Sequence, residues 1–429
     1  MNPDFRKYAP PVSDTADLNM PEISTRVLDS GIKVTTHRSC DADVCYITLI
    51  REGGTAEAQS PAVSALASGL INEGTASFDS ETIADTLDRN GAWLTTGTSA
   101  HHRRLSLYSL NSQLPHVLPI LSEITGTPAF PDDIVQIRTQ ILAQNIGVSQ
   151  QDVNYLAHCL SDKMIMGNHH PLARIDTPDE ILAITPSAIR QFHQKYNSAT
   201  STHLFISGNI DENTETLIIN AVNHIPANPV KAPLIITPYT PMPHNSVMTS
   251  ALDHATQSAV VITIPGIPRN HTDYIPLNLT VLALGGYFGS RLMTNIREEK
   301  GLTYGIRASL LGQHDGSHIE ISAETDNKST TRLIEEVRSE LARLSSDPPR
   351  GEELTRIKRA ATTSMRAIID NPFGPIDFRM TMLTSDIPET YFKDKIDAIK
   401  ALTPDTIARI ATTYLRPDTI LTAVSGSHS

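Results

Sequence analysis

Apolar residues along the chain follow two spacings, one typical of helices and one typical of strands. In the stretch AITPSAIRQFHQKYNSATSTHLFISGN (183–209), Ile189, Phe192 and Tyr196 recur every three or four positions, which predicts the buried face of an amphipathic helix. The run HLFIS follows and stops at Gly208, which predicts a strand. This stretch therefore predicts one helix followed by one strand.

The same pattern returns near the end of the chain. The stretch ALTPDTIARIATTYLRPDTILTAVSGS (401–427) aligns with the first one without a gap, so that a Thr-Pro pair, a tyrosine and a Ser-Gly pair coincide. In each copy the threonine, Thr185 or Thr403, is suited to cap a helix whose first residue is a proline. A gapless match over so long a stretch indicates an internal duplication.

The preceding parts of the two copies also correspond, although more loosely. Each half has an early strand (CYITLIREGG, AVVITIPG), then an apolar helix that ends near Gly74 or Gly301, then a strand pair whose second member is RLSLYSL or HIEISAE. Amphipathic helices follow in both halves. We therefore expect an α+β fold made of two homologous α/β-sandwich domains.

The proline-bearing stretch IPANPVKAPLIITPYTPMPHN (225–245) separates the two halves. Its prolines cannot continue a helix, so the stretch predicts a linker. We accordingly expect an N-terminal extension over 1–20, a first domain over 21–224 and a second domain over 246–429. A duplicated pair of domains suggests a cleft between the halves, but duplication by itself specifies no chemistry.

Composition and charge narrow the functional classes. Apolar residues make up 39% and charged residues 19% of the 429 residues, and the formal charge is −12 without a basic block. Because nucleic acid demands clustered lysine and arginine, we expect no nucleic-acid partner. The three cysteines, Cys40, Cys45 and Cys159, are too few for a disulfide framework and lack the paired spacing of a zinc ribbon.

The N-terminal sequence and the apolar runs bear on location. The sequence MNPDFRKYAPPVSD lacks the apolar stretch of a signal peptide, and no run approaches the 18 or so apolar residues that a membrane span needs. We therefore expect no membrane association. The expected compartment is the cytoplasm, or the periplasm if a leader has been removed.

The most informative stretch is LGGYFGSRLMTNIREEKGLTYGIRA (284–308). Its glycines predict a turn, after which Ser290 is suited to cap a helix that ends at Gly301. Arg297 lies in the last turn of this helix, and Tyr304 follows just inside the next strand. Such a junction can bring a guanidinium and a phenol side by side, where both would donate hydrogen bonds to a peptide carbonyl.

This stretch resembles the second half of the pitrilysin/insulinase-type zinc peptidases, including the mitochondrial processing peptidase and its bacterial relatives. Those proteins carry a glycine-rich turn, a Ser-Arg-Leu-type helix start and an Arg-Glu…Gly-Leu-x-Tyr run, whose Arg and Tyr bind the substrate backbone across the cleft from the zinc. The resemblance implies that Arg297 and Tyr304, seven residues apart, bind a peptide substrate. It covers essentially the whole chain and implies the family's duplicated metallohydrolase fold, with both domains forming one half of a clamshell.

The zinc motif of that family is missing from the first half. Active members carry His-x-x-Glu-His on a helix, a few residues before Gly-Thr, because two histidines bind the zinc and the glutamate activates a water molecule. Counting back from Gly74-Thr75 in SPAVSALASGLINEGTASF places the histidine positions at Ala65 and Gly69, and the glutamate position at Ser68. None of these residues can ligate zinc or act as a base.

The third zinc ligand of the family, a distant glutamate, is missing as well. Its position falls at Gln144 or Asn145, where a neutral amide is a poor substitute for an anionic ligand. The chain also contains neither a His-Glu nor a Glu-His dipeptide, which removes both orientations of the zinc helix motif. We therefore expect no metal, no cofactor and no catalytic residue in this chain.

The remaining histidines are weaker candidates for a metal site. The adjacent pair His101-His102 precedes a strand, where neighbouring side chains point to opposite faces and make poor joint ligands. The pair His169-His170 lies in a loop before a proline. His314 and His318 are four residues apart, but the Asp-Gly pair between them predicts a turn rather than a helix.

These features lead to one main hypothesis and two alternatives. The resemblance implies a non-catalytic subunit of a heterodimeric zinc peptidase, which supplies Arg297 and Tyr304 while a homologous partner brings the zinc. One alternative is a structural protein, because relatives serve as core subunits of a respiratory complex. The other is a homodimer that binds peptides without cleaving them. A neighbouring gene that encodes a similar chain with His-x-x-Glu-His would favour the first hypothesis.

Overall fold

The computed structural model describes residues 7, 18–39, 41–227, 232–385 and 387–427. Among these residues the strands form two sheets, one of six and one of five strands. The first sheet has the order β1-β2-β6-β3-β5-β4 and the second the order β7-β11-β8-β10-β9. The strands of the first sheet are β1 (Ser24–Val27), β2 (Lys33–Arg38), β3 (Cys45–Glu52), β4 (Trp93–Thr98), β5 (His102–Ser109) and β6 (Thr202–Gly208). Those of the second are β7 (Val247–Ala251), β8 (Gln257–Pro265), β9 (Ile306–Gly312), β10 (Ser317–Asp326) and β11 (Leu421–Gly426).

The two sheets share one topology, which confirms the duplicated α+β fold. In the first sheet β6 pairs in parallel with β2 and antiparallel with β3. In the second sheet β11 pairs in parallel with β7 and antiparallel with β8. The hairpin β4–β5 then corresponds to the hairpin β9–β10, and β1 has no counterpart in the second sheet.

Helices line the faces of both sheets. Those before β7 are α1 (Pro61–Gly69), α2 (Ser80–Arg89), α3 (Leu114–Gly126), α4 (Asp132–Ser149), α5 (Val153–Met166), α6 (Pro178–Leu182), α7 (Pro186–Tyr196) and α8 (Glu212–Val222). After β8 come α9 (Tyr274–Val281), the π-helices η5 (Leu282–Gly286) and η6 (Met293–Glu299), α10 (Thr330–Ser346), α11 (Gly351–Asp370), α12 (Gly374–Thr384), α13 (Tyr391–Ala401) and α14 (Pro404–Tyr414). The helices predicted from the amphipathic runs are thereby confirmed.

The repeated helix starts form as the Thr-Pro pairs predicted. The Thr185 hydroxyl accepts a hydrogen bond from the backbone N–H of Ala188 at the start of α7, and Thr403 accepts one from Thr406 at the start of α14. Helix α7 leads into β6, the third strand in the order of its sheet, and α14 leads into β11, the second strand in the order of its sheet. The gapless sequence match therefore reflects one structural unit used twice.

The order of the elements corrects one detail of the expected correspondence. We matched the helix end at Gly74 with the one at Gly301. In the structure α1 and α2 both lie between β3 and β4, and the element directly before β9 is η6. Gly301 therefore corresponds to Gly91, which lies directly before β4. The backbone agrees, because φ is +58° at Gly91 and +60° at Gly301, whereas it is +123° at Gly74.

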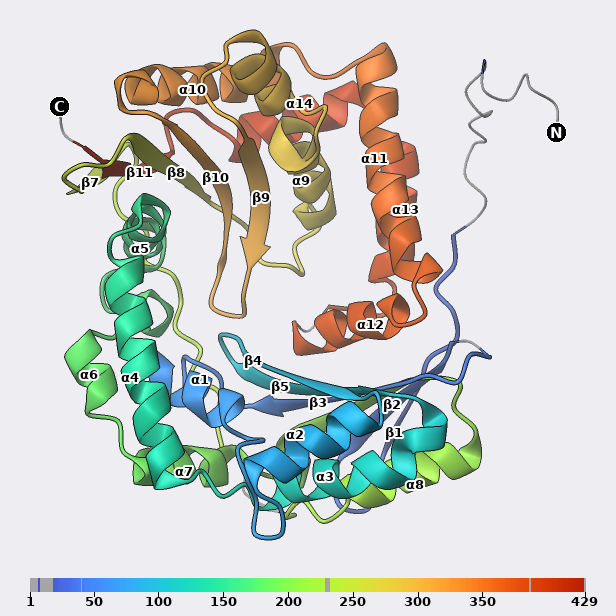
Figure 1. Ribbon diagram of the computed structural model, residues 1–429. Coiled ribbons are helices and arrows are strands. Elements are labelled where there is room, and N and C mark those ends of the chain that lie inside the picture. Colours follow the sequence, from blue (N-terminus) through green and yellow to red (C-terminus); the bar gives the residue numbers. More distant parts are fainter. Residues whose placement is uncertain (1–6, 8–17, 40, 228–231, 386, 428–429) are drawn as a thin grey trace.

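Two helices each pack on the sheet that belongs to the other half of the chain. Helix α5 packs on the second sheet, where Ala157 and Met164 belong to the same buried hydrophobic cluster as Val261. Helix α12 packs on the first sheet, where Ile376 belongs to the same cluster as Tyr46. Figure 1 shows the two sheets facing each other, with α5 and α12 between them, while α2, α3 and α8 cover the outer face of the first sheet. Each half of the chain therefore contributes one helix that packs on the sheet of the other half.

The proline-bearing stretch joins the halves through backbone contacts. Its described residues form no helix or strand up to Ser246. The N–H groups of Thr240 and Met242 donate to the carbonyls of Met166 and Met164 at the end of α5, at 2.9 and 2.8 Å. We keep 225–245 as our proposed division between the two domains. Within the part of the chain that the structure describes, the search for a helix able to span a membrane finds none.

Candidate functional site

The candidate site is built on η6, a π-helix that runs from Met293 to Glu299. The N–H of Lys300 donates to the carbonyl of Asn295, five residues earlier, at 3.1 Å. Such wide turns are rare and are frequently found at functional sites. Gly301 ends the helix as predicted, with φ at +60°. The predicted cap at Ser290 is wrong, because its buried hydroxyl has no hydrogen-bond partner among the described residues.

Arg297 is held at the end of this helix by three contacts. Its Nε donates to the backbone carbonyl of Tyr304 at 3.1 Å, and its Nη1 lies 3.6 Å from the Glu298 carboxylate. Its guanidinium carbon lies 4.8 Å from the centre of the Phe288 ring, a cation–π contact. The side chain is 34% exposed, so the guanidinium keeps donors available at the surface.

Tyr304 lies in the bend before β9 and points into solvent. Strand β9 begins at Ile306, so the prediction that Tyr304 lies inside the strand is wrong by two residues. The reason is that the glycine-ended helix is followed by a short loop, Leu302 to Gly305, before the strand ladder begins. Tyr304 is 93% exposed. The bond from Arg297 thus fixes the backbone of Tyr304 and leaves the phenol free to meet another molecule.

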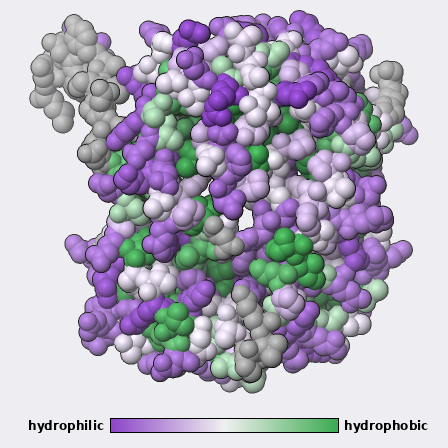
Figure 2. Space-filling model, turned by 180° about the vertical axis from the view of Figure 1, so that it is seen from behind, coloured by the Kyte–Doolittle hydropathy of each residue, from purple (hydrophilic) through white to green (hydrophobic). Residues whose placement is uncertain are grey.

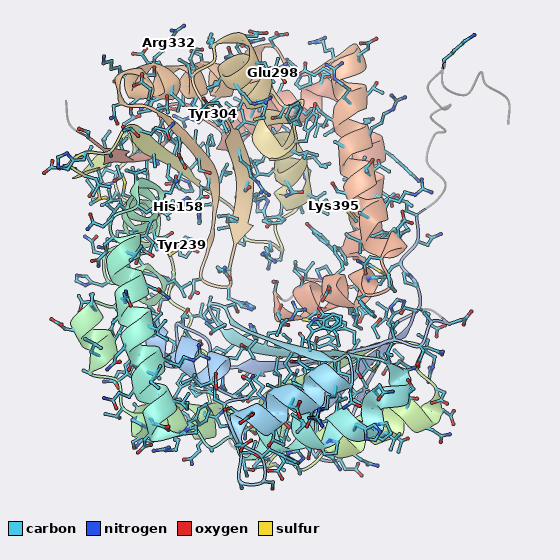
Figure 3. All side chains as sticks on the ribbon, viewed as in Figure 1. His158, Tyr239, Glu298, Tyr304, Arg332 and Lys395 are labelled. Atoms are coloured by element: carbon cyan, nitrogen blue, oxygen red, sulfur yellow. The ribbon has the colours of Figure 1, made fainter. Side chains whose placement is uncertain are left out.

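Arg297 and Tyr304 line the same open pocket, of about 740 Å³. Three carboxylates share it, from Glu298, Glu324 and Asp326. Figure 3 shows Tyr304 and Glu298 projecting from neighbouring parts of this region. The pocket therefore combines a guanidinium and a phenol, which donate hydrogen bonds to carbonyl oxygens, with carboxylates, which accept them from peptide N–H groups. The sequence predicted Arg297 and Tyr304 but not the three carboxylates that line the same pocket.

The positions at which we expect the zinc motif lie together on α1. Ala65 is half-buried, Ser68 is buried with no partner for its hydroxyl among the described residues, and Gly69 is exposed. A Cβ added at Gly69 would meet no atom within 4 Å, so packing does not forbid a larger side chain there. Gln144 and Asn145 are exposed on α4.

The described residues also offer no alternative metal centre. In the part of the chain that the structure describes, no three His, Cys, Asp or Glu side chains are placed to hold a metal ion together. Of the cysteines, Cys45 is buried and Cys159 partly buried, and neither forms a disulfide, while Cys40 lies outside the described residues.

Sequence reasoning missed a buried ionic cluster at His101. Its Nδ1 lies 2.7 Å from the Glu57 carboxylate and its Nε2 lies 2.6 Å from the Asp315 carboxylate, with all three side chains at most 1% exposed. Both carboxylates accept, so the imidazole donates from both nitrogens and is protonated. Burial alone would lower the pKa of His101, but the bonds to Asp315 and Glu57 outweigh it and raise the pKa to about 9.

This cluster joins the two halves of the chain. His101 lies in the turn between β4 and β5, and Asp315 in the turn between β9 and β10. The backbone N–H of Ile235, in the proline-bearing stretch, donates to Glu57 at 3.1 Å. The partners lie 44 and 214 residues from His101 along the chain. No local pattern connects residues so far apart, so sequence reasoning had no signal for the cluster.

Residues 183–361 match the sequence model of the peptidase M16 inactive domain. The uncharacterized zinc protease YmxG of Bacillus subtilis is 20% identical over 305 residues, 70% of this chain and 73% of that protein. The non-peptidase homolog YmxG of Helicobacter pylori is 23% identical over 357 residues, 78% of this chain and 80% of that protein.

The chain is similar to M16 peptidases. This confirms the resemblance to the pitrilysin/insulinase peptidases that the second-half motif suggested, and the matched inactive domain includes η6, Arg297 and Tyr304. An M16 inactive-domain structure from Pseudomonas fluorescens, 23% identical, covers 95% of this chain and 98% of its own with a TM-score of 0.87. That likeness confirms the fold of this chain.

A further structural relative is larger than this chain. The periplasmic protease PqqL of Escherichia coli matches with a TM-score of 0.77 at 15% identity. The match covers 98% of this chain but 49% of that protein. The fold described here therefore equals about half of PqqL.

Proposed function

We propose that this chain is a non-catalytic subunit of a two-subunit zinc peptidase. A homologous partner would supply the zinc, and this chain would supply Arg297 and Tyr304 to bind the peptide. The observation that carries the proposal is the contrast within the chain. The pocket on η6 presents a partly exposed guanidinium and an exposed phenol, whereas the motif positions on α1 carry alanine, serine and glycine.

The chemistry of the pocket supports peptide binding. Arg297 and Tyr304 can donate to a peptide carbonyl, while Glu298 and Glu324 can accept from peptide N–H groups. Two donors directed at one carbonyl would hold the substrate and stabilise negative charge that develops on its oxygen. The Arg297 side chain donates to the backbone carbonyl of Tyr304, so the backbone of the loop that carries Tyr304 is held in place before the substrate arrives.

The likeness to PqqL supports pairing with a second unit. One half of that protease has the fold of this chain, and the rest of that protein lies outside the match. We propose that a separate homologous chain takes the corresponding place here. The site would act in the cytoplasm, or in the periplasm if a leader has been removed.

Co-purification and mutation of the pocket test the proposal together. The native host should yield this chain with a homologous chain that carries His-x-x-Glu-His, and the pair should cleave peptides. Arg297→Ala or Tyr304→Phe should lower kcat/KM at least about tenfold, because each removes a donor to the reacting carbonyl. Arg307→Ala is the matched control, because Arg307 is an exposed arginine on β9 outside this pocket.

The outcomes separate the proposal from its alternatives. Loss of activity in both pocket variants, with activity retained in Arg307→Ala, supports a substrate-binding subunit. Full activity in both pocket variants would reduce the chain to a scaffold, as a structural homologue would be. Isolation of this chain only with itself would favour a homodimer that binds peptides.

A further inference from the structure

A second pocket, of about 320 Å³, adjoins η6 away from the residues discussed so far. It lies where α10 ends and α11 begins, and η6 contributes Asn295 to its wall. Its lining is rich in charge of both signs. Four arginines and four carboxylates contribute to it, so the formal charge of the lining is zero. A purely anionic or purely cationic ligand would gain little net attraction from such a lining.

The positive side of this pocket gathers around the start of α11. Arg291 lines it, is 9% exposed, and binds Glu353 side-on through Nε at 2.8 Å and Nη2 at 3.1 Å. Its third nitrogen, Nη1, is buried and has no hydrogen-bond partner among the described residues. Arg350 precedes α11 and provides no side-chain cap. The first N–H groups of this 20-residue helix therefore add positive potential here.

The negative side gathers around the end of α10. Glu340 is 1% exposed, and its Oε1 accepts from Asn295 at 2.7 Å and from Arg343 at 2.8 Å. Its Oε2 is buried without a hydrogen-bond partner among the described residues. Asp347 follows α10 as its C-cap. The carbonyls of the last helical turn add to the negative potential of these carboxylates.

A ligand that satisfies both sides must itself carry both charges. Two charged residues that line the pocket each carry a buried polar atom without a partner among the described residues, a donor on Arg291 and an acceptor on Glu340. A carboxylate suits Arg291, Arg350 and the start of α11. An ammonium group suits Glu340, Asp347 and the end of α10. Buried polar groups are normally paired, so two orphaned atoms of opposite character in one pocket point to a common ligand.

We propose that this pocket binds a small zwitterion, a free α-amino acid or a dipeptide. The carboxylate would bind between Arg291 and Arg350, and the ammonium group would bind Glu340. The site is separate from the pocket of Arg297 and Tyr304, although η6 contributes to both. The proposal does not depend on a peptidase partner, because the site lies wholly within this chain.

Thermal unfolding of the purified full chain tests the proposal. The melting temperature is measured with each of the twenty amino acids, with a set of dipeptides, and with the N-acetyl and amide forms of whichever compound stabilises most. A ligand that binds only the folded state raises the melting temperature. We expect a zwitterion to raise it and both single-charge forms to fail. Stabilisation by amino acids but not dipeptides, or the reverse, identifies the source of the zwitterion.

Variants of the pocket then locate the binding site by calorimetric titration with that same compound. Arg350→Ala should weaken its affinity at least about tenfold, which is the scale of one charge-assisted contact. Glu340→Gln should do the same while keeping the shape of the buried side chain. Arg332→Ala is the matched control, because Arg332 is an exposed arginine on α10 outside the pocket (Figure 3).

Three results would overturn the proposal. The first is that no amino acid or dipeptide changes the melting temperature or produces heat on titration, which would mean that solvent alone satisfies the buried groups. The second is equal stabilisation by the N-acetyl or amide form, because one charge would then suffice. The third is that Arg350→Ala binds as tightly as Arg332→Ala, because the ligand would then lie elsewhere. Arg350 is exposed and makes no ion pair among the described residues, so its removal leaves the fold intact.

Discussion

The two halves of this chain contain the same helix–glycine–hairpin unit, and the two copies differ in one element. In the first copy α2 ends before Gly91 and leads into β4–β5, and in the second η6 ends before Gly301 and leads into β9–β10. The glycines have the same left-handed φ, +58° and +60°. However, α2 is a regular α-helix and η6 is a π-helix. The two copies therefore share the backbone turn at the glycine, but the helix before it is an α-helix in the first copy and a π-helix, which carries Arg297, in the second.

The two copies also meet each other at their hairpin tips. The His101 bridge runs from the β4–β5 turn to Asp315 in the β9–β10 turn. Figure 1 shows these two turns facing one another across the space between the sheets, and Figure 2 shows the surface hollowed between the two layers. The equivalent parts of the repeat are thus joined by a contact that neither copy could make alone.

Breaking this bridge should have the largest effect on stability. His101→Gln removes the cation and leaves Glu57 and Asp315 buried without a charged partner, which typically costs about 3–5 kcal/mol. We expect the free energy of unfolding, measured by urea titration at pH 6, to fall by that amount. His116→Gln on the exposed surface of α3 is the control and should change little. A loss equal to that of the control would mean that the tips do not hold the halves together.

The same bridge makes stability depend on pH with a defined sign. The pKa of His101 is raised from 6.5 to about 9 in the folded state, so the folded protein holds the proton more tightly than the unfolded chain. The added stability is fully present below pH 6.5 and is lost as the pH rises through about 9. Wild-type stability should therefore fall over that range more steeply than that of His101→Gln. Parallel curves for the two proteins would contradict the assignment.

The regular parts of this architecture could be predicted because they depend on local patterns. The Thr-Pro caps at Thr185 and Thr403, the helix periodicity and the strand runs each involve a few neighbouring residues. The gapless repeat then supplied the duplicated topology without any long-range contact. The turn at Gly301 was likewise predictable, because a glycine after a helix is suited to a left-handed φ.

The remaining features depend on contacts that sequence patterns do not carry. The packing of α5 on the second sheet and α12 on the first exchanges helices between halves, and an amphipathic pattern does not specify which sheet a helix covers. The apolar spacing over Met293–Glu299 is equally readable as an α-helix, although the structure forms a π-helix there. The loop that places Tyr304 before β9 depends on where pairing with β10 begins. Family resemblance supplied Arg297 and Tyr304, but not the carboxylates of their pocket.

The paired glycines allow the shared turn to be separated from the site. A Cβ at Gly91 or Gly301 would meet no atom within 4 Å, so Gly91→Ala and Gly301→Ala should each cost only backbone strain, about 1 kcal/mol. We expect equal losses in urea unfolding. Only Gly301→Ala should also lower peptide cleavage by the complex, because it shifts the loop between Arg297 and Tyr304. Equal activity in both variants would show that the second turn has no special role in the site.

Substitutions at the starts of α2 and η6 give the smallest predicted effect on stability. They test whether the two helices begin in the same way. Asp79 caps α2 by accepting from the N–H of Thr82 at 2.8 Å, so Asp79→Ala should lower the melting temperature by a few degrees. Ser290 precedes the helix that becomes η6, and its buried hydroxyl makes no hydrogen bond among the described residues. Ser290→Ala should therefore leave the melting temperature unchanged or slightly raised, because it removes an unsatisfied polar group. A loss at Ser290 as large as that at Asp79 would mean that the hydroxyl caps the helix in solution, and that the two helices start alike before η6 widens.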